Sequence, residues 1–387
     1  MDVSELILRT ADTGLCWQRD DGSFPAGKNG PYGNTDTPVR NTSHWSITLT
    51  EAYVRSGEKS YLEGVHGAMD FLTSKDCRPH GYSFKHRDRE YEGQDQTNGL
   101  IGQAWTIESL AVVAGIVDRP GLLDLAAETF LLHPFNEETA LWRIIDTNGE
   151  VLGYDATFNH QLWFAMSGGL LAEQLASNNH EDHEAVEDRV RAFLDNLGVL
   201  MRTFPNGLII HPLLPSNPRT YIRNVRVNRE FQASIFKKWV KMVFFKAVNT
   251  WKARSTSQIL KKSIPYHPFN LYALGILKDL YPEASIWQSD KFHGVYRYSK
   301  RDSFLESLEG DQYAYAYNPP GFELPFFWSI IEGSISDISK GLFKKQLRHS
   351  YNFEKNVMIN GTDDKYTHAA RFYECTRLPN FELGDMP

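Results

Sequence analysis

The sequence predicts an all-α protein, an (α/α)6 toroid of six helical hairpins with long loops and small β-hairpins on one rim. Three observations support this fold class. Apolar residues recur at helical spacing through most of the 387 residues, with no competing run of alternating strand pattern. Short and long connections alternate along the chain. The first three long connections end just before His44, Gly102 and His160, which are 58 residues apart in both intervals.

Apolar periodicity and capping residues predict twelve helices, arranged as six pairs. Their ranges are 4–17, 44–55, 60–73, 102–117, 122–132, 161–176, 184–201, 234–261, 270–280, 285–296, 324–332 and 335–351. The long connections are 18–43, 74–101, 133–160, 202–233 and 297–323. A repeat of outer helix, long loop, inner helix and short turn brings every long loop to the same rim of a closed ring. An open solenoid is the alternative, but its repeats usually span only about 20–45 residues.

The third long loop also contains a β-hairpin over residues 142–154. Its Asn148-Gly149 pair predicts a type I′ turn. A small hairpin of this kind fits on the rim of a helical barrel, so we expect residues 1–387 to form a single domain.

The composition is that of a folded globular protein, because 41% of the residues are apolar and 23% are charged. These values exclude a mostly disordered chain, collagen and coiled coil. The start of the chain lacks a secretory signal, and the three cysteines are dispersed, so a cytoplasmic location is expected. Aromatic residues make up 13% of the chain, which suits either a large core or a surface that stacks on flat ligands.

Two segments stand apart from the helical repeat. Residues 229–262 carry a net charge of +8 in a chain of net charge −7, with apolar residues interleaved at helical spacing. This pattern indicates a basic amphipathic helix with a solvated lysine face, and the functional alternatives are a groove for an anionic polymer or peripheral contact with acidic lipids at the inner membrane surface. Nucleic acid is not an expected partner, since the whole chain is acidic and lacks a recognition motif. Residues 357–387 form a C-terminal tail, either on the surface or folded back over the rim.

The first three long loops each place an aspartate five to eight residues before an inner helix. Asp36, Asp95 and Asp155, together with His44 and His160, are therefore the candidate catalytic residues, because glycoside cleavage needs a proton donor and a base or nucleophile. The candidate substrate-binding residues offer amides, aromatic faces or cations, and they are Arg40, Trp45, Gln96, Asn98, Gln103, Trp105, Asn159, Trp163, His368 and Arg371. The structural alternative is that the aspartates are helix caps or turn residues and that the histidines bond loop carbonyls. No cofactor and no metal are expected, since no phosphate loop or metal motif is present.

Two of the inner helices open with motifs that resemble a known family. Gly102-Gln103-Ala104-Trp105 and the segment Asp155-Ala156-Thr157-Phe158-Asn159-His160-Gln161-Leu162-Trp163 resemble the six-hairpin glycosidase superfamily, most closely its agl-cluster protein Q group and more distantly the unsaturated glucuronyl hydrolases. In those hydrolases a rim aspartate works as general acid and base. An arginine commonly precedes the first motif there, whereas Ile101 stands here, so the aspartate's role is not carried over to one residue of this chain.

Three functions follow from these patterns, all with an oligosaccharide or lipid-linked glycan as partner. The first is a glycoside hydrolase-like enzyme for a uronate-containing or acidic oligosaccharide, with Asp95 or Asp155 as the proton donor. The second is a uronate lyase or C5-epimerase, with His44 or His160 as the base. The third is a non-catalytic glycan-binding protein of a glycan-assembly pathway.

Overall fold

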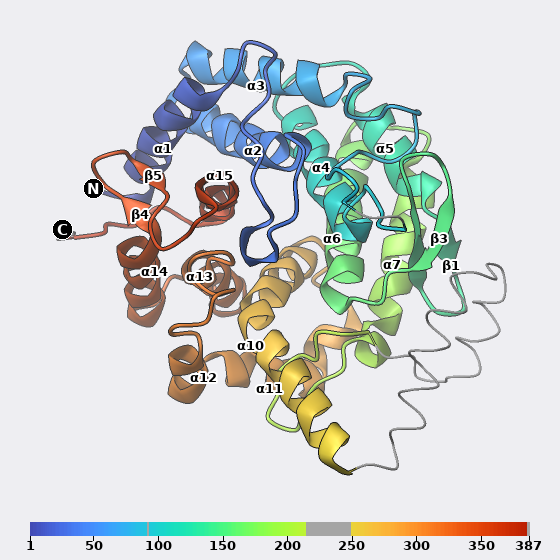
Figure 1. Cartoon of the computed structure of the whole chain (residues 1–387), viewed down its shortest axis with the longest axis vertical. Helices are drawn as coiled ribbons and strands as arrows, with labels where there is room; N and C mark the ends of the chain where they lie inside the picture. The colour runs from blue at the N-terminus through green and yellow to red at the C-terminus, as the bar shows by residue number, and fades with distance from the viewer. Residues whose placement is uncertain (91–92, 214–248, 385–387) are drawn as a thin grey trace.

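The computed structural model describes residues 1–90, 93–213 and 249–384, with backbone alone for 249–256. In this part of the chain the helices form two concentric rings (Figure 1). The inner ring consists of α2 (Val39–Ser56), α4 (Gly99–Ala114), α6 (Phe158–Ser177), α10 (Asn249–Leu280), α13 (Pro320–Glu332) and α15 (Lys365–Ala370), which continues into the 3-10 helix η4 (Arg371–Arg377). The outer ring consists of α1 (Val3–Trp17), α3 (Lys59–Leu72), α5 (Leu122–Leu132), α7 (His183–Leu200), α11 (Asp290–Ser299) and α14 (Asp337–Ser350).

The inner ring is closed. Each inner helix packs against the next one along the chain, and η4 packs against both α13 and α2. The chain ends meet beside this closure, where Asp2 pairs with Glu382 in an isolated β-bridge. These contacts confirm the predicted (α/α)6 toroid and exclude the open solenoid, whose first and last repeats would not touch.

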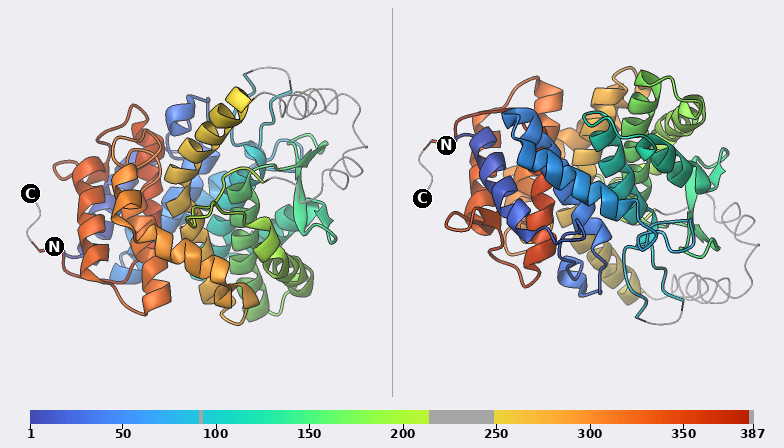
Figure 2. Two further views of the ribbon diagram at one scale, coloured as in Figure 1. Left: turned by 90° about the horizontal axis from the view of Figure 1, so that it is seen from below. Right: turned by 90° about the horizontal axis from the view of Figure 1, so that it is seen from above.

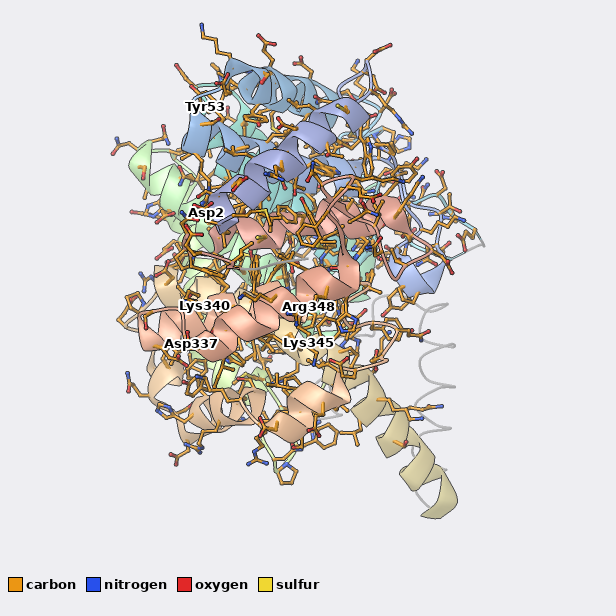
Figure 3. The ribbon with its side chains drawn as sticks, turned by 90° about the vertical axis from the view of Figure 1, so that its left-hand side faces the viewer. Asp2, Tyr53, Asp337, Lys340, Lys345 and Arg348 are labelled. Atoms are coloured by element: carbon orange, nitrogen blue, oxygen red, sulfur yellow. The ribbon has the colours of Figure 1, made fainter. Side chains whose placement is uncertain are left out.

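The two rings differ in sequence because they differ in environment. Nearly every side chain of α4 is buried, including the polar Gln103 and Glu108, since this helix has neighbours on all sides. The outer α14 is amphipathic. It buries Leu342 and Leu347 and leaves Asp337 and Arg348 exposed on the outer surface (Figure 3).

The short and long connections lie as the alternation predicts. Short turns join the end of an inner helix to the next outer helix, as at Gly57, whose φ of +72° ends α2 in the left-handed region. The long loops join outer helices to the starts of the next inner helices, so these loops and the N-terminal ends of the inner helices share one rim. In the two edge-on views, strands β1 (Phe135–Asn136), β2 (Leu141–Ile145) and β3 (Val151–Tyr154) project from the side of the ring (Figure 2).

The predicted hairpin is present, but its turn is not type I′. Strands β2 and β3 pair in antiparallel fashion, with Arg143 opposite Tyr154. Only Gly149 has a positive φ, of +86°, and its N–H donates to the carbonyl of Asp146. The register shifts after Ile144, so a type I turn followed by a left-handed glycine replaces the two-residue turn.

Several helix boundaries differ from the prediction. Helices α4 and α6 begin three residues earlier than expected, and α2 begins at Val39 rather than at His44. The segments predicted at 234–261 and 270–280 belong, where described, to one helix, α10, which contains Pro265 and Pro268. The two prolines lie in the interval between the predicted helices, and the helix continues through both of them. The greater part of the basic segment, residues 229–248, lies outside the described residues.

The C-terminal segment completes the inner ring. Residues Lys365–Ala370 and Arg371–Arg377 form α15 and η4, and their apolar side chains, such as Phe372, are fully buried. Short connecting elements complete the described fold: η1 (Gly30–Tyr32), η3 (Ser285–Gln288), α12 (Asp302–Ser307), β4 (Tyr351–Asn352) and β5 (Val357–Met358). Within the described residues, no helix combines the length and the apolar character that a membrane span requires.

Candidate active site

A cavity of about 370 Å³ opens at the rim where the long loops meet the N-terminal ends of the inner helices. Seven of the residues singled out in the sequence line it: Asp95, Asn98, Trp105, Asp155, Asn159, His160 and Arg371. The remaining lining residues were not anticipated, and they are Asn29, Tyr32, Asn34, Arg87, Gly99, Ile101, Ile144, Thr157, His211, Lys262, Tyr266, Phe269, Tyr317 and Asn318.

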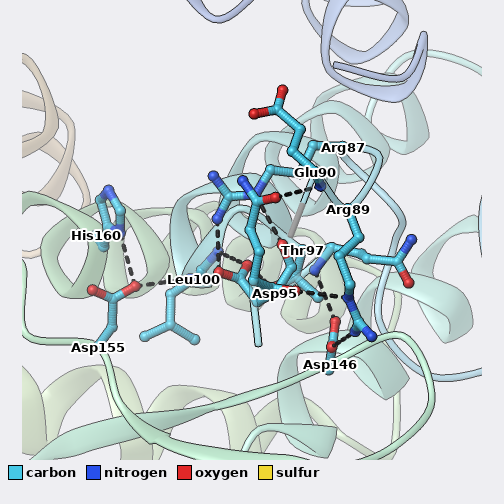
Figure 4. Close-up of polar contacts among 12 residues, drawn as sticks. Arg87, Arg89, Glu90, Asp95, Thr97, Leu100, Asp146, Asp155 and His160 are labelled. Carbon is cyan, nitrogen blue, oxygen red and sulfur yellow. Dashed lines mark hydrogen bonds and ion pairs between the residues drawn. The ribbon is translucent and has the colours of Figure 1, made fainter. Parts of the chain in front are cut away.

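An aspartate–histidine pair lies at the start of α6 (Figure 4). The Nδ1 atom of His160 is 2.7 Å from Oδ2 of Asp155. About a quarter of the His160 side chain is exposed, whereas Asp155 is buried beneath it. Because Asp155 holds Nδ1, the second ring nitrogen, Nε2, is the one available to a ligand in the cavity.

Asp155 is held as a carboxylate. Burial alone would raise its pKa, but the electrostatic attraction and hydrogen bond of the His160 ring and the backbone N–H groups of Leu100 and Thr157 outweigh burial and lower it. The Leu100 N–H, 3.1 Å away, belongs to the first turn of the neighbouring helix α4, whose positive end also favours an anion. A carboxylate of this kind orients and stabilises an imidazolium and does not readily donate a proton.

Both carboxylate oxygens of Asp95 also have partners within the protein. Its Oδ1 accepts the N–H of Gly99 at 2.8 Å, and its Oδ2 pairs with Arg87 at 2.7 Å. Asp95 and Asp155 therefore take successive N–H groups at the start of α4. Gly99 has a φ of +64°, and a Cβ there would fall 2.4 Å from Oδ2 of Asp155, so only glycine permits this approach. The helix-cap alternative thus describes the contacts of Asp95.

A second histidine lines the cavity. The ring of His211 lies 4.6 Å from that of Tyr266 and is tilted by 46° to it, and the backbone N–H of His211 donates to the hydroxyl of Ser263. Burial, reinforced by the charges of His160 and Lys262, lowers the pKa of His211 to about 3, so this ring is neutral. His211 lies within the long connection 202–233, which has no repeat signature, and the sequence pattern therefore did not reveal it.

One wall of the cavity is built from tyrosines around a lysine. The ammonium of Lys262 lies 4.1 Å from the ring centre of Tyr32 and 5.0 Å from that of Tyr266. The hydroxyls of these two tyrosines are 2.5 Å apart. Burial lowers the pKa of Lys262 to about 8. This ammonium contacts tyrosine rings and one hydroxyl, which leaves it able to receive an anionic ligand group.

Trp105 supplies an aromatic wall whose far face is already occupied. The guanidinium of Arg40 lies 4.2 Å from the ring centre of Trp105 and bonds Asn29, which lines the cavity. Arg40 itself is buried behind this wall and forms a 3.6 Å ion pair with Asp36. Burial, opposed by Arg40, raises the pKa of Asp36 to about 6, but neither residue lines the cavity.

Two predicted histidines lie in the interior, not in the cavity lining. His44 is fully buried, stacks at 4.2 Å on Tyr373 and meets Trp105 edge-on at 5.3 Å. Burial, then the charges of Arg40 and Arg371, lower its pKa well below the ordinary value. Burial lowers the pKa of His368 to about 3 in the same way. Both rings are therefore neutral and lie out of reach of a ligand in the cavity.

The recurrent tryptophans point in three different directions. Trp45 packs outward, stacked at 5.4 Å on Phe24, and Trp163 packs against the neighbouring helix, stacked at 4.2 Å on Phe269. Both rings are buried in the core, and only Trp105 reaches the cavity.

The recurrent glutamines hold the loops in place. Gln103 bonds both the N–H and the carbonyl of Phe84, and Gln161 bonds the same two groups of Trp142. These two glutamines are 58 residues apart, so the same two-bond contact between an inner helix and the loop before it, here called the loop clamp, occurs in both repeats. Gln96 also lies outside the cavity lining, where its N–H bonds Asp146.

Arg371 connects the cavity to a buried cluster of charges. Its Nη2 atom is 3.0 Å from Glu323 and 2.6 Å from Glu374, and all three side chains are buried. Burial raises the pKa of Glu323 well above its ordinary value and that of Glu374 to about 7. The pair therefore shares a proton beside one arginine, and Arg371 is largely neutralised from within. Across the described residues, no cluster of histidine, cysteine and acidic side chains is placed to hold a metal ion.

This closed double ring with a polar rim cavity is an (α/α)6 toroid, a fold that solved sugar epimerases share. No family model matches the chain. A sugar epimerase from a ruminal bacterium superimposes with a TM-score of 0.63 at 12% identity, over 97% of each chain. Cellobiose 2-epimerase from Bacillus thermoamylovorans also superimposes with a TM-score of 0.63, at 10% identity, over 97% of this chain and 98% of its own. These likenesses establish the fold.

A sequence relative identifies the family. Archaeal glycosylation protein Q of Haloferax volcanii is 39% identical over 388 residues, which cover 98% of each chain. The chain therefore belongs to the archaeal glycosylation protein Q family. The motifs at 102–105 and 155–163 had indicated a resemblance to this group.

Proposed function

We propose that this protein is a glycan-processing enzyme that moves a proton on an acidic sugar residue, as a uronate C5-epimerase does. The observation that carries the proposal is the His160–Asp155 pair, which presents a ring nitrogen to the cavity above a buried carboxylate. The name of the Haloferax relative, a glycosylation protein, supports an oligosaccharide of a glycosylation pathway as the substrate.

The chemistry follows from the roles that the lining residues can take. Nε2 of His160 removes the proton from the carbon next to the sugar carboxylate, and Asp155 stabilises the imidazolium that forms. The ammonium of Lys262 stabilises the negative charge that develops on the carboxylate oxygens. Return of a proton to the opposite face requires a second group that carries a proton, and the hydroxyls of Tyr32 and Tyr266 in the lining each carry one.

Hydrolysis by two carboxylates receives less support from the geometry. A glycosidase needs a proton donor with a raised pKa facing its substrate. Asp155, which lines the cavity, has a lowered pKa, whereas Asp36, with a raised pKa, does not line it. Asp95 is tied to Arg87 and to the start of α4.

Solvent exchange tests the proposal. The protein is incubated in deuterated water with oligosaccharides that contain hexuronic acid, and NMR and mass spectrometry locate the incorporated deuterium. We expect deuterium at C5, abolished in His160→Asn. His180→Asn is the control, because His180 also pairs with an aspartate, Asp124 at 2.9 Å, but on the surface and outside the cavity. Release of saccharide without deuterium on carbon, or unchanged exchange in His160→Asn, would overturn the proposal.

A further inference from the structure

A second hollow adjoins the central cavity. Its volume is about 490 Å³, and it is lined by residues of α10 and by the segment 307–313 that precedes α13. Lys262 lines both hollows. The two spaces are therefore neighbours, separated at this point by the side chain of one residue and the rings that surround it.

The wall between the hollows is a layer of one ammonium and two aromatic rings. The Nζ atom of Lys262 lies 3.7 Å from the ring centre of Tyr313, which faces the second hollow, and 4.1 Å from that of Tyr32, which faces the first. The two tyrosine rings are 5.4 Å apart. A ligand that fills the central cavity thus meets this layer from one side, and the second hollow begins on the other.

Tyr313 is held in this position by its own loop. The N–H of Tyr313 bonds the carboxylate of Asp311 at 2.8 Å, and its carbonyl accepts the N–H of Asn318. Two residues further on, Tyr315 is buried against His349 at 4.5 Å and has a φ of +50°. A left-handed tyrosine is costly and persists only where its surroundings fix it, so Tyr315 anchors the loop while Tyr313 faces outward.

The lining of the second hollow suits a sugar. Gln258 and Gln312 offer amides for hydroxyl groups, Asp311 offers acceptor oxygens, and Tyr313 offers the face of a ring. Lys261 and Lys262 add positive charge, and the second carboxylate of the lining, Glu309, is paired with Lys345. The same combination of amides, aromatic faces and a cation lines the central cavity, so the two hollows offer one kind of surface on both sides of Lys262.

We propose that the second hollow is a subsite for the sugar that follows the one in the central cavity, so that the protein binds an acidic oligosaccharide across Lys262 and Tyr313. This inference rests on the proposed function, because it extends that substrate by one position. In this arrangement the ammonium of Lys262 lies at the junction of two sugar residues, where a carboxylate of either one can reach it.

Binding as a function of chain length tests the subsite. Glucuronic acid oligomers and oligogalacturonides of one to four residues are titrated calorimetrically into the wild-type protein. We expect affinity to rise about tenfold or more when the second sugar is added, which is the scale of one well-packed aromatic contact. Tyr313→Ala should remove that gain, Tyr313→Phe should keep it, and Tyr82→Ala should match wild type, because Tyr82 is an exposed tyrosine that lines neither hollow.

The outcomes separate this subsite from the proposed reaction. If affinity rises with length in wild type and in His160→Asn while wild type itself exchanges no deuterium, the subsite stands and the proton-transfer function falls. If wild type exchanges deuterium but binds one sugar as tightly as four, the subsite falls and the function stands. Affinity that does not rise with length in either series, including the absence of measurable binding, overturns the subsite. A gain that survives Tyr313→Ala overturns it as well.

Discussion

Replacing Asp155 by Asn removes the charge beneath His160 and keeps the size of the side chain. Oδ2 of Asp155 accepts His160 Nδ1 at 2.7 Å and the Leu100 N–H at 3.1 Å, and Oδ1 accepts the Thr157 N–H at 3.1 Å. The side-chain amide of asparagine has one accepting oxygen, and its NH2 group would face a donor that a carboxylate oxygen of Asp155 now accepts. Since a hydrogen bond to a charged group contributes about 1.5–3 kcal/mol, we expect Asp155→Asn to lower the free energy of unfolding by roughly 2–4 kcal/mol.

The effect on turnover should be larger than the effect on stability. Without the carboxylate, the imidazolium at His160 loses its stabilising partner and the ring loses its fixed orientation. General acid–base catalysis typically contributes about 10²–10⁴-fold, so proton exchange should fall by roughly 10²-fold or more. The assay is the deuterium-exchange rate with a hexuronate oligosaccharide, measured beside thermal unfolding of the same sample.

The pH dependence has a definite sign. The folded-state pKa of Asp155 lies below the ordinary value of 3.8, so its stabilisation is present above about pH 4 and is lost as the pH falls through the lower, folded-state pKa. The difference in melting temperature between wild type and Asp155→Asn should therefore be largest near neutral pH and shrink in acid.

Asp146→Asn is the matched control for this prediction. Asp146 is also a buried carboxylate, paired with Arg89 at 2.9 Å and bonded to the N–H groups of Gln96 and Thr147, but it does not line the cavity. We expect a comparable loss of stability with a much smaller loss of exchange. Equal losses of exchange in the two variants, or full activity in Asp155→Asn, would refute the role given to the His160–Asp155 pair.

Three further predictions concern residues outside the catalytic pair. Gln161→Ala leaves the backbone groups of Trp142 without their partner and should lower the free energy of unfolding by about 1–3 kcal/mol; an unchanged denaturant midpoint would contradict the loop clamp. Arg371→Met leaves Glu323 and Glu374 without their cation and should cost about 3–5 kcal/mol in chemical denaturation, and a variant as stable as wild type would exclude the buried ion cluster as described. Asp36 has a folded-state pKa of about 6 against an ordinary value of 3.8. As the pH rises from about 4 to about 6, the free energy of unfolding of wild type should therefore fall relative to that of Asp36→Asn. Parallel stability curves for the two proteins would show that the shift is absent.

The sequence supports the prediction of the fold more fully than that of the site. The 58-residue interval between His44, Gly102 and His160 locates the first two turns of three inner helices, because the lengths of helix, loop and turn repeat around the ring. Boundaries shifted by several residues, since caps such as Asn98 precede the apolar run that periodicity detects. The sixth inner helix was missed as a helix because α15 and η4 are short and carry Arg371 and Glu374 inside the ring, where a tail composition was expected.

Part of the site follows from the repeat and part does not. Asp95, Asp155 and His160 reach the cavity because they precede or open inner helices on the rim. Trp45 and Trp163 lie near the starts of inner helices, as Trp105 does, but they pack against Phe24 and Phe269, because the direction of a side chain depends on which neighbour the helix meets.

Other lining residues come from segments without a repeat. His211 and Lys262 lie on opposite sides of residues 214–248, and only the tertiary structure brings them to one cavity. Tyr313 and Tyr317 of the fifth long loop lie beside Tyr32, whereas Tyr315 between them is buried against His349, so their alternation in the sequence does not predict this arrangement.

The deuterium content of recovered substrate is the measurement that tests the central claim most directly. Wild-type protein incubated with a hexuronate oligosaccharide in deuterated water should place deuterium on the carbon next to the carboxylate. His160→Asn should abolish this incorporation and His180→Asn should not. Cleavage of the oligosaccharide with no deuterium on carbon, or incorporation that persists in His160→Asn, would contradict proton transfer by His160.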